Sequence, residues 1–168
     1  TFCGNGGRCI AAFAYQQGII KENATYEAVD GIHNVSVLQK SINEFHVELS
    51  MCDILSYKYD ENTLLINTGS PHYVKKINNL SDLDVNAEGA KIRYDKEISE
   101  DGVNVDFLLN DNGKIRIRTY ERGVENETLA CGTGVTASAI AASLWFGGND
   151  IDVYTQIASL NVKFDRDN

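Results

Sequence analysis

The stretch "TFCGNGGRC", residues 1–9, and the stretch "ACGTG", residues 130–134, decide the fold of this chain. Each places a cysteine directly before a Gly-x-Gly turn and a run of small apolar residues. Aligned without gaps, the two stretches pair Cys3 with Cys131, Gly4 with Gly132, Gly6 with Gly134, Ala11 with Ala139 and Ala14 with Ala142. This weak internal repeat predicts that the chain builds one structural element twice.

The segments that follow the two cysteines carry no charged side chain. They are "CIAAFAYQQGII", residues 9–20, and "GVTASAIAASLWFGGN", residues 134–149. A helix that is apolar on every side is buried on every side. We therefore expect two central helices wrapped by strands, the first ending at Gly18 and the second at Gly147.

Strand patterns fill most of the remaining chain. Alternating or continuous apolar runs predict strands at 33–39, 45–51, 63–67, 103–110, 114–121, 151–155 and 160–164, with Asn112-Gly113 as a hairpin turn. A third helix is expected over about 86–95, capped by Asn86. The single proline, Pro71, is expected to lie in a loop, "TGSPHYV". The fold class is α/β of the α+β type, with two similar halves that each curl a mostly antiparallel sheet around a central buried helix. The polar stretch at 53–62 predicts a boundary between residues 1–52 and 53–168.

Charge and cysteine content exclude several classes of function. The net charge of the 168 residues is -9 and the basic residues are scattered, which argues against nucleic-acid and anionic-membrane partners. No apolar run is long enough to span a membrane.

The four cysteines form no Cys-x-x-Cys pair and the three histidines do not cluster with them, so no metal site is expected. Without a recognisable secretory signal, we expect reduced thiols in a cytoplasm. A Cys3–Cys131 disulfide stays open as an oxidation product.

A cysteine at the start of a helix has a defined chemistry. The positive end of the helix dipole favours the thiolate, and backbone N–H groups freed by glycines can hold a carboxylate. Two such sites suggest a carboxylate held between two helix ends, with a thiol on each side of the adjacent carbon. This arrangement suits proton removal from one face and delivery to the other. The alternatives are small buried structural cysteines and a phosphate-binding turn, although neither copy carries the Lys-Ser/Thr ending of a P-loop.

Four motifs together carry a family resemblance. "FCGNGGRC", "TGSPHYV", "GVNVDF" and "YERGVENETLACGTG", in this order, resemble diaminopimelate epimerases. The resemblance implies two similar α/β halves with the active site in the cleft between them. It also implies an isomerase without cofactor or metal that converts LL-diaminopimelate to meso-diaminopimelate, in lysine and peptidoglycan precursor synthesis. The expected partner is then a small amino-acid substrate, with no nucleic acid and no membrane, and a homodimer is left open.

The resemblance also implies roles for single residues. Cys3 and Cys131 match the two catalytic thiols, and His72 with Glu121 matches the pair that tunes their acidity. The implied substrate-binding residues are Gly4, Asn5, Ser70, Asn104, Glu121, Arg122, Gly132 and Thr133. Ser70 stands where the family usually has asparagine, and Ser is shorter and lacks the amide donor. His33, His46, Cys9 and Cys52 are interpreted as structural or incidental.

Three other functions remain open at this level. A proline or hydroxyproline racemase would share the two-thiol logic, although Asn5 and "YERG" favour diaminopimelate. A non-catalytic anion-binding fragment and a thiol redox protein are the alternatives from other classes. Family members have substantial segments on both sides of the part that this chain resembles. The sequence is therefore interpreted as a fragment, and we expect the isolated chain to be inactive or nearly so.

Overall fold

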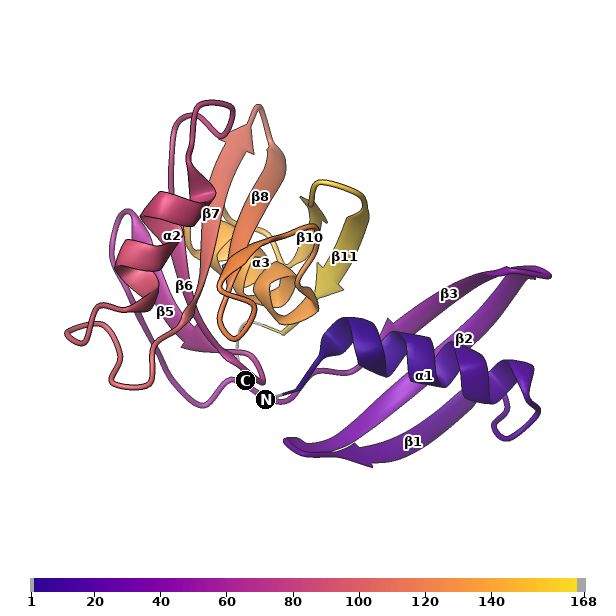
Figure 1. Ribbon diagram of the computed structural model, residues 1–168. Coiled ribbons are helices and arrows are strands. Elements are labelled where there is room, and N and C mark those ends of the chain that lie inside the picture. Colours follow the sequence, from indigo (N-terminus) through magenta and orange to yellow (C-terminus); the bar gives the residue numbers. More distant parts are fainter. Residues whose placement is uncertain (1, 166–168) are drawn as a thin grey trace. The chain divides into compact units, whose positions relative to one another are not determined.

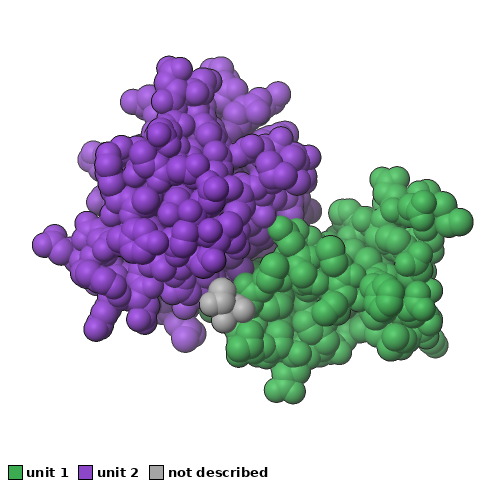
Figure 2. Space-filling view, in the orientation of Figure 1, with its two compact units in different colours: residues 1–53 green, residues 54–168 purple. Residues whose placement is uncertain are grey.

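A computed structural model describes residues 2–165 of the chain. It divides into two compact units, residues 1–53 and residues 54–168, which are coloured separately in Figure 2. Each unit has its own sheet and its own buried cluster of apolar side chains.

Unit 1 is one helix on a three-stranded antiparallel sheet (Figure 1). Helix α1 (Gly4–Gln16) is followed by β1 (Asn23–Ala28), β2 (Gly31–Ser41) and β3 (Glu44–Leu49), in the sheet order β1-β2-β3. The small core contains Ala11 of α1 and Val35 and Val37 of β2. Gly18, with a φ of +71°, follows the helix end, as the sequence predicts.

Helix α1 is covered on one face only. Its buried residues are Gly4, Gly7 and Ala11, whereas Ile10 is 64% and Phe13 is 60% exposed. The expectation that this helix is buried on every side is therefore wrong for unit 1. The physical reason is that three strands present one sheet face, which covers only one side of a helix.

Unit 2 is built on an eight-stranded mixed sheet. Its strands are β4 (Tyr57–Tyr59), β5 (Thr63–Asn67), β6 (Pro71–Lys76), β7 (Asn104–Asp111), β8 (Lys114–Glu121), β9 (Asn126–Thr128), β10 (Asp150–Tyr154) and β11 (Ser159–Lys163). The order is β11-β10-β8-β7-β6-β5-β4, and β9 pairs with β8 outside this path. The β6–β7 and β8–β10 pairs are parallel and the others are antiparallel.

The two remaining helices lie against this sheet (Figure 1). They pack on different sets of its side chains. Side chains alternate between the faces of a strand, so β5, β6, β7 and β8 each contribute to two separate clusters. Helix α3 (Gly132–Phe146) packs with Leu64, Ile66, Val74, Leu108, Ile115, Ile117 and Val153. Helix α2 (Val85–Arg93) packs with Val103, Val105, Phe107 and Tyr120.

Helix α3 confirms the prediction of a helix buried on every side. All of the residues from Thr133 to Ala139 are buried, and so are Ala141, Ala142 and Ser143. The helix ends at Gly147, whose φ of +91° is one that glycine adopts without strain. None of the helices in the described part of the chain is long and apolar enough to cross a membrane.

Local expectations are confirmed at some positions and wrong at others. The β7–β8 hairpin turns at Asn112 and Gly113, whose φ angles are +51° and +90°. The cap of α2 is Asp84 and not Asn86, because the Asp84 side chain accepts a hydrogen bond from the backbone N–H of Ala87 at 3.0 Å. The "TGSPHYV" stretch is not all loop, since Pro71 begins β6.

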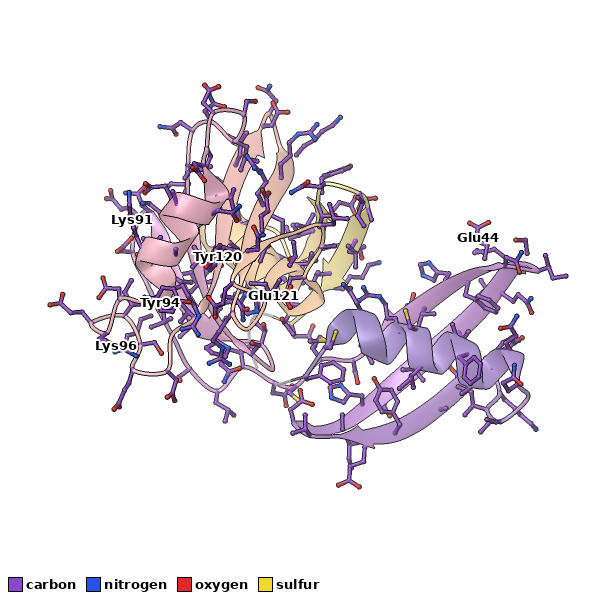
Figure 3. All side chains as sticks on the ribbon, in the orientation of Figure 1. Glu44, Lys91, Tyr94, Lys96, Tyr120 and Glu121 are labelled. Carbon is purple, nitrogen blue, oxygen red and sulfur yellow. The ribbon has the colours of Figure 1, made fainter. Side chains whose placement is uncertain are left out.

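Gly89 sets the distance between α2 and β8. A Cβ atom at this position would lie 2.4 Å from the Cβ of Tyr120, which is labelled in Figure 3. Changing Gly89→Ala improves helix propensity by about 1 kcal/mol, but overpacking costs about 1–3 kcal/mol or more. We expect a net loss in the free energy of unfolding, measured by urea denaturation with the fluorescence of the single tryptophan, Trp145. Lys91→Ala on the same helix is the control and should change stability by less than about 0.5 kcal/mol. If Gly89→Ala were as stable as the unchanged chain or more stable, the close approach of α2 to β8 would be contradicted.

Candidate active site

The two cysteines of the repeat occupy the same structural position in their units. Cys3 is the N-cap of α1, with φ and ψ of -115° and 102°, and Cys131 is the N-cap of α3, with -116° and 115°. Both backbones are extended, and the first helical residue of each is a glycine. The repeated Cys-Gly-x-Gly pattern therefore produces the same helix start twice.

The two thiols differ in their surroundings. Cys3 is exposed, and its Sγ accepts a hydrogen bond from the backbone N–H of Gly6 at 3.4 Å. Cys131 is buried, and its Sγ lies 3.4 Å from the hydroxyl oxygen of Thr133. Only Cys3 therefore caps its helix with the side chain.

A chain of hydrogen bonds connects Cys131 to the sheet. The Thr133 hydroxyl is 2.8 Å from Nε2 of His72 on β6. Nδ1 of His72 is 2.7 Å from Oδ2 of Asp106 on β7, and the hydroxyl of Thr119 on β8 donates to Oδ1 of Asp106 at 2.7 Å. All four side chains are buried. Because a carboxylate only accepts, Nδ1 of His72 carries a hydrogen in this arrangement.

The alternation of the strands explains why these groups meet. On β6, β7 and β8, residues Val74, Leu108 and Ile117 belong to the cluster around α3. Two positions away on the same strands lie His72, Asp106 and Thr119, which the alternation places on the same face. The register pairs Asp106 directly with Thr119. Three neighbouring strands thus present polar side chains to the start of α3, where apolar ones would otherwise stand.

Gly134 allows α3 to approach this polar group. A Cβ at Gly134 would lie 2.4 Å from Oδ1 of Asp106 and 3.2 Å from Cε1 of His72. The second glycine of the Cys-Gly-x-Gly pattern is therefore required by the contact between helix and buried carboxylate.

The surroundings of His72 favour its charged form. Complete burial by itself lowers the pKa of His72, but Asp106 and, to a smaller extent, Cys131 raise it, with a net increase from 6.5 to about 10. An imidazolium would donate from both nitrogens, to Asp106 and to Thr133. The Thr133 hydroxyl is then available to donate to the sulfur of Cys131.

Asn104 holds the neighbouring end of the sheet together. Its amide nitrogen donates to the Ser70 hydroxyl at 2.8 Å and to the Pro71 carbonyl at 3.0 Å. Its amide oxygen accepts from the backbone N–H of Arg122 at 2.9 Å. The side-chain Nη1 of Arg122 donates to the carbonyl of Gly102 at 3.2 Å. Asn104 therefore fixes the position of Arg122, which directly follows β8.

The structure gathers most of the residues singled out by the sequence within unit 2. One hydrogen-bonded group joins Cys131, Thr133 and His72, and a second joins Ser70, Asn104 and Arg122. The two groups meet where Nδ2 of Asn104 lies 3.4 Å from Nε2 of His72. Glu121 lies at the end of β8 (Figure 3). In unit 1, Gly4 and Asn5 form the first turn of α1 after Cys3, and the Asn5 side chain accepts from Arg8. Sequence reasoning missed Asp106 and Thr119. The signal was present, because both polar residues interrupt an apolar alternation.

One further group in the described residues has the composition of a metal site. Ligand atoms of Asp30, His33 and Cys52 in unit 1 lie within 4.8 Å of one another. These groups are hydrogen-bonded to one another and to the backbone. His33 contacts the Ser50 carbonyl at 2.7 Å and Asp30 at 3.0 Å, and Cys52 donates to the Asp30 carbonyl at 3.3 Å. Burial lowers the pKa of His33, but the Ser50 and Asp30 contacts outweigh it and raise the pKa above its usual value.

The raised pKa of His72 predicts how stability depends on pH. The contribution of the charged histidine is complete below about pH 6.5 and is lost as the pH rises through about 10. We expect the difference in unfolding free energy between the unchanged chain and His72→Gln to shrink across this window. Urea denaturation followed by Trp145 fluorescence measures it, and Trp145 lies in α3 of the same unit. A difference that is constant or grows with pH would exclude a buried charged histidine.

The chain is similar in sequence to proteins of one family. The family model described as "Diaminopimelate epimerase" matches residues 64–168, which is more than half of the chain. A diaminopimelate epimerase from Flavobacterium psychrophilum is 43% identical over 100% of this chain and 65% of its own length. One from Chlorobaculum tepidum is 42% identical over 83% of this chain and 56% of its own length. The chain thus spans about three fifths of the length of these relatives.

A solved structure shows the same fold. The phenazine biosynthesis protein of the PhzF family from Bacillus anthracis superposes with a TM-score of 0.69, over 99% of this chain and 69% of that one, at 12% identity. This likeness confirms the mixed α/β fold class. The family match and the 43% identical relative show that the chain belongs to the diaminopimelate epimerase family.

Proposed function

We propose that the protein inverts the α-carbon of LL-diaminopimelate to give meso-diaminopimelate, as an isomerase of lysine and peptidoglycan precursor synthesis. The observation that carries the proposal is the pair of matched helix starts. Cys3 and Cys131 cap α1 and α3 with nearly the same backbone angles. The family match and the names of the curated relatives support the substrate.

The proposed reaction uses one thiol as base and the other as acid. A thiolate takes the α-proton, so that an S–H bond forms as the C–H bond breaks and the electron pair stays on carbon. The second thiol delivers its proton to the opposite face of that carbon and becomes a thiolate. The helix N-termini stabilise each thiolate, and in unit 2 His72 and Thr133 add hydrogen bonds toward Cys131.

The helix starts also offer groups that hold the α-carboxylate. Backbone N–H groups in the first turn of a helix point toward its N-terminal end, where an anion can accept from them. Those of Gly4 and Asn5 in α1, and of Gly132 and Thr133 in α3, would bind the carboxylate next to the reacting carbon. The charge that develops during proton removal lies close to the same groups, which lowers its energy.

The opposite end of the substrate carries a second amino acid centre. We propose that Glu121 and Arg122 bind this second centre, with Ser70 and Asn104 nearby. A glutamate accepts from an ammonium group, and an arginine can donate two parallel hydrogen bonds to a carboxylate. Glu121 is also assigned, with His72, to tuning the acidity of the thiols.

Proton exchange tests the two-thiol proposal. The assay is deuterium uptake at the α-carbon of LL-diaminopimelate in D₂O under reducing conditions. It is run on this chain and on a chimera that adds the unmatched parts of the Flavobacterium relative. We expect exchange in the chimera, and a loss of about a hundredfold or more in Cys3→Ala and in Cys131→Ala.

Cys9→Ala is the matched control, because Cys9 is an exposed thiol on α1, the helix that Cys3 caps. It should retain exchange. A chimera without exchange on diaminopimelate would overturn the substrate, and exchange on L-proline would then favour the racemase alternative. Exchange that survives both alanine variants would overturn the two-thiol mechanism.

Recognition of the distal carboxylate gives a separate prediction. In the chimera, Arg122→Ala should lower kcat/KM for diaminopimelate by about 10–100-fold, since one charged hydrogen-bond pair contributes about 1.5–3 kcal/mol. The backbone bond from Arg122 to Asn104 is kept in this variant. With a substrate analogue that lacks the distal carboxylate, Arg122→Ala should not lower kcat/KM, because this analogue offers the guanidinium no group to bind. Equal losses for both substrates would show that Arg122 acts on structure and not on recognition.

A further inference from the structure

Asp106 lies outside the residues that the resemblance assigns to the site, yet it is the charged group on which the site is built. Its side chain has no exposed surface, and neither has that of His72. One carboxylate oxygen contacts Nδ1 of His72 and the other accepts from Thr119. Burying a carboxylate to this extent costs free energy unless its oxygens accept hydrogen bonds from the surrounding protein.

We propose that Asp106 is a positioning residue for Cys131, acting through His72 and Thr133. This inference rests on the proposed function, in which the sulfur of Cys131 exchanges a proton with the substrate. Asp106 binds the Nδ1–H of His72 and so keeps Nε2 directed at the Thr133 hydroxyl. That hydroxyl in turn lies at the sulfur of Cys131.

The fixed orientation of His72 allows the hydrogen bonds beyond it to reverse. When Cys131 is a thiol, its S–H donates to Thr133 and the Thr133 hydroxyl donates to Nε2 of a neutral His72. When Cys131 is a thiolate, Nε2–H donates to Thr133 and the hydroxyl donates to the sulfur. The geometry of 3.4 Å and 2.8 Å is compatible with both directions, because the hydroxyl donates and accepts.

Conversion between the two states transfers one proton without a change of oxidation state. The S–H bond of Cys131 breaks as an O–H bond forms on Thr133, and the original Thr133 hydrogen forms an N–H bond on Nε2. Thiol and imidazole become thiolate and imidazolium. The charged groups that face His72 are Asp106 from β7 and Cys131 at the start of α3, and both favour the imidazolium.

The carboxylate is itself held on two sides. Thr119 donates to it from the neighbouring strand, and the missing side chain of Gly134 leaves it room against α3. An isolated structural ion pair would need neither the Thr133 contact nor the alignment with Cys131. The continuous series from Thr119 to Cys131 therefore points to a role in the chemistry of the thiol.

The first test needs no substitution. Nitrogen NMR of the full chain labelled with ¹⁵N-histidine reports which ring nitrogens of His72 carry hydrogen. We expect Nδ1 to be protonated throughout, and both nitrogens to be protonated at neutral pH. A His72 with an unprotonated Nδ1 would overturn the proposal even if no variant folded.

The second test removes the charge of Asp106 and measures the thiol directly. In a chain with Cys3, Cys9 and Cys52 changed to serine, the alkylation rate of Cys131 is followed against pH. Asp106→Asn should lower the titration midpoint of His72 by about 1–3 units. It should also slow the alkylation of Cys131 at neutral pH by about tenfold or more, with Asp106→Glu restoring part of the rate.

Asp111→Asn is the matched control, since Asp111 lies on the same strand but is 42% exposed and pairs with Arg116. It should leave both measurements unchanged. A shift at His72 without any change at Cys131 would also overturn the proposal, because Asp106 would then serve structure alone. Neither measurement uses diaminopimelate. The chimera could show no proton exchange on diaminopimelate while Asp106→Asn lowers both the His72 midpoint and the alkylation rate of Cys131. That result would reject the proposed substrate and keep the role of Asp106.

Discussion

The hydrogen bond of 2.7 Å between His72 and Asp106 is the constraint on which the rest of unit 2 depends. Two ionisable groups without exposed surface must satisfy each other and be satisfied by neighbours, or the burial cost exceeds the attraction. Thr119 supplies a donor for the carboxylate, and Thr133 contacts the imidazole. The lack of a Cβ at Gly134 brings the helix close enough for this contact. Removing one partner would leave a buried charge uncompensated, which explains why the polar residues stand together on adjacent strands.

The two helix starts share their backbone geometry but not their electrostatics. Cys-Gly-x-Gly gives both cysteines an extended backbone followed by a helical turn. Helix α3 is enclosed by apolar side chains, so the groups near Cys131 interact in a medium of low polarity, where charge–charge contacts are strong. Cys3 accepts a backbone hydrogen bond from Gly6 in unit 1, and the charge of the Arg8 guanidinium interacts with it. The charged group near Cys3 is therefore a half-buried arginine, whereas Cys131 adjoins a fully buried histidine and carboxylate.

Uncharged runs after the two cysteines predicted α1 and α3, and apolar alternation or continuous apolar runs predicted β2, β3, β5, β7, β8, β10 and β11. The sequence did not predict β1, β4, β6 and β9. The Asn112-Gly113 turn was predictable since both residues tolerate a positive φ. The α2 cap was placed at Asn86 and lies at Asp84, because both residue types cap helices and only packing selects between them. Pro71 was assigned to a loop, although the first residue of a strand tolerates proline. The exposure of α1 does not follow from its apolar pattern alone, because such a pattern shows that a face avoids water but not how many strands cover it.

The register of β8 links the acid–base groups to the groups proposed for the distal end of the substrate. Thr119 and Glu121 lie two residues apart on one strand, so they share a face and are separated by about 7 Å. Glu121 pairs with Asn126 of β9, and the next residue, Arg122, is fixed to Asn104 by its backbone N–H. These bonds hold the end of β8 independently of the loop that leads to Cys131, so changes in loop length need not move Glu121. A shift of β8 by one residue would turn Thr119 and Glu121 to the opposite face together. The hydrogen bond of Thr119 to the buried carboxylate therefore also fixes the position of the group that we assign to the substrate's ammonium.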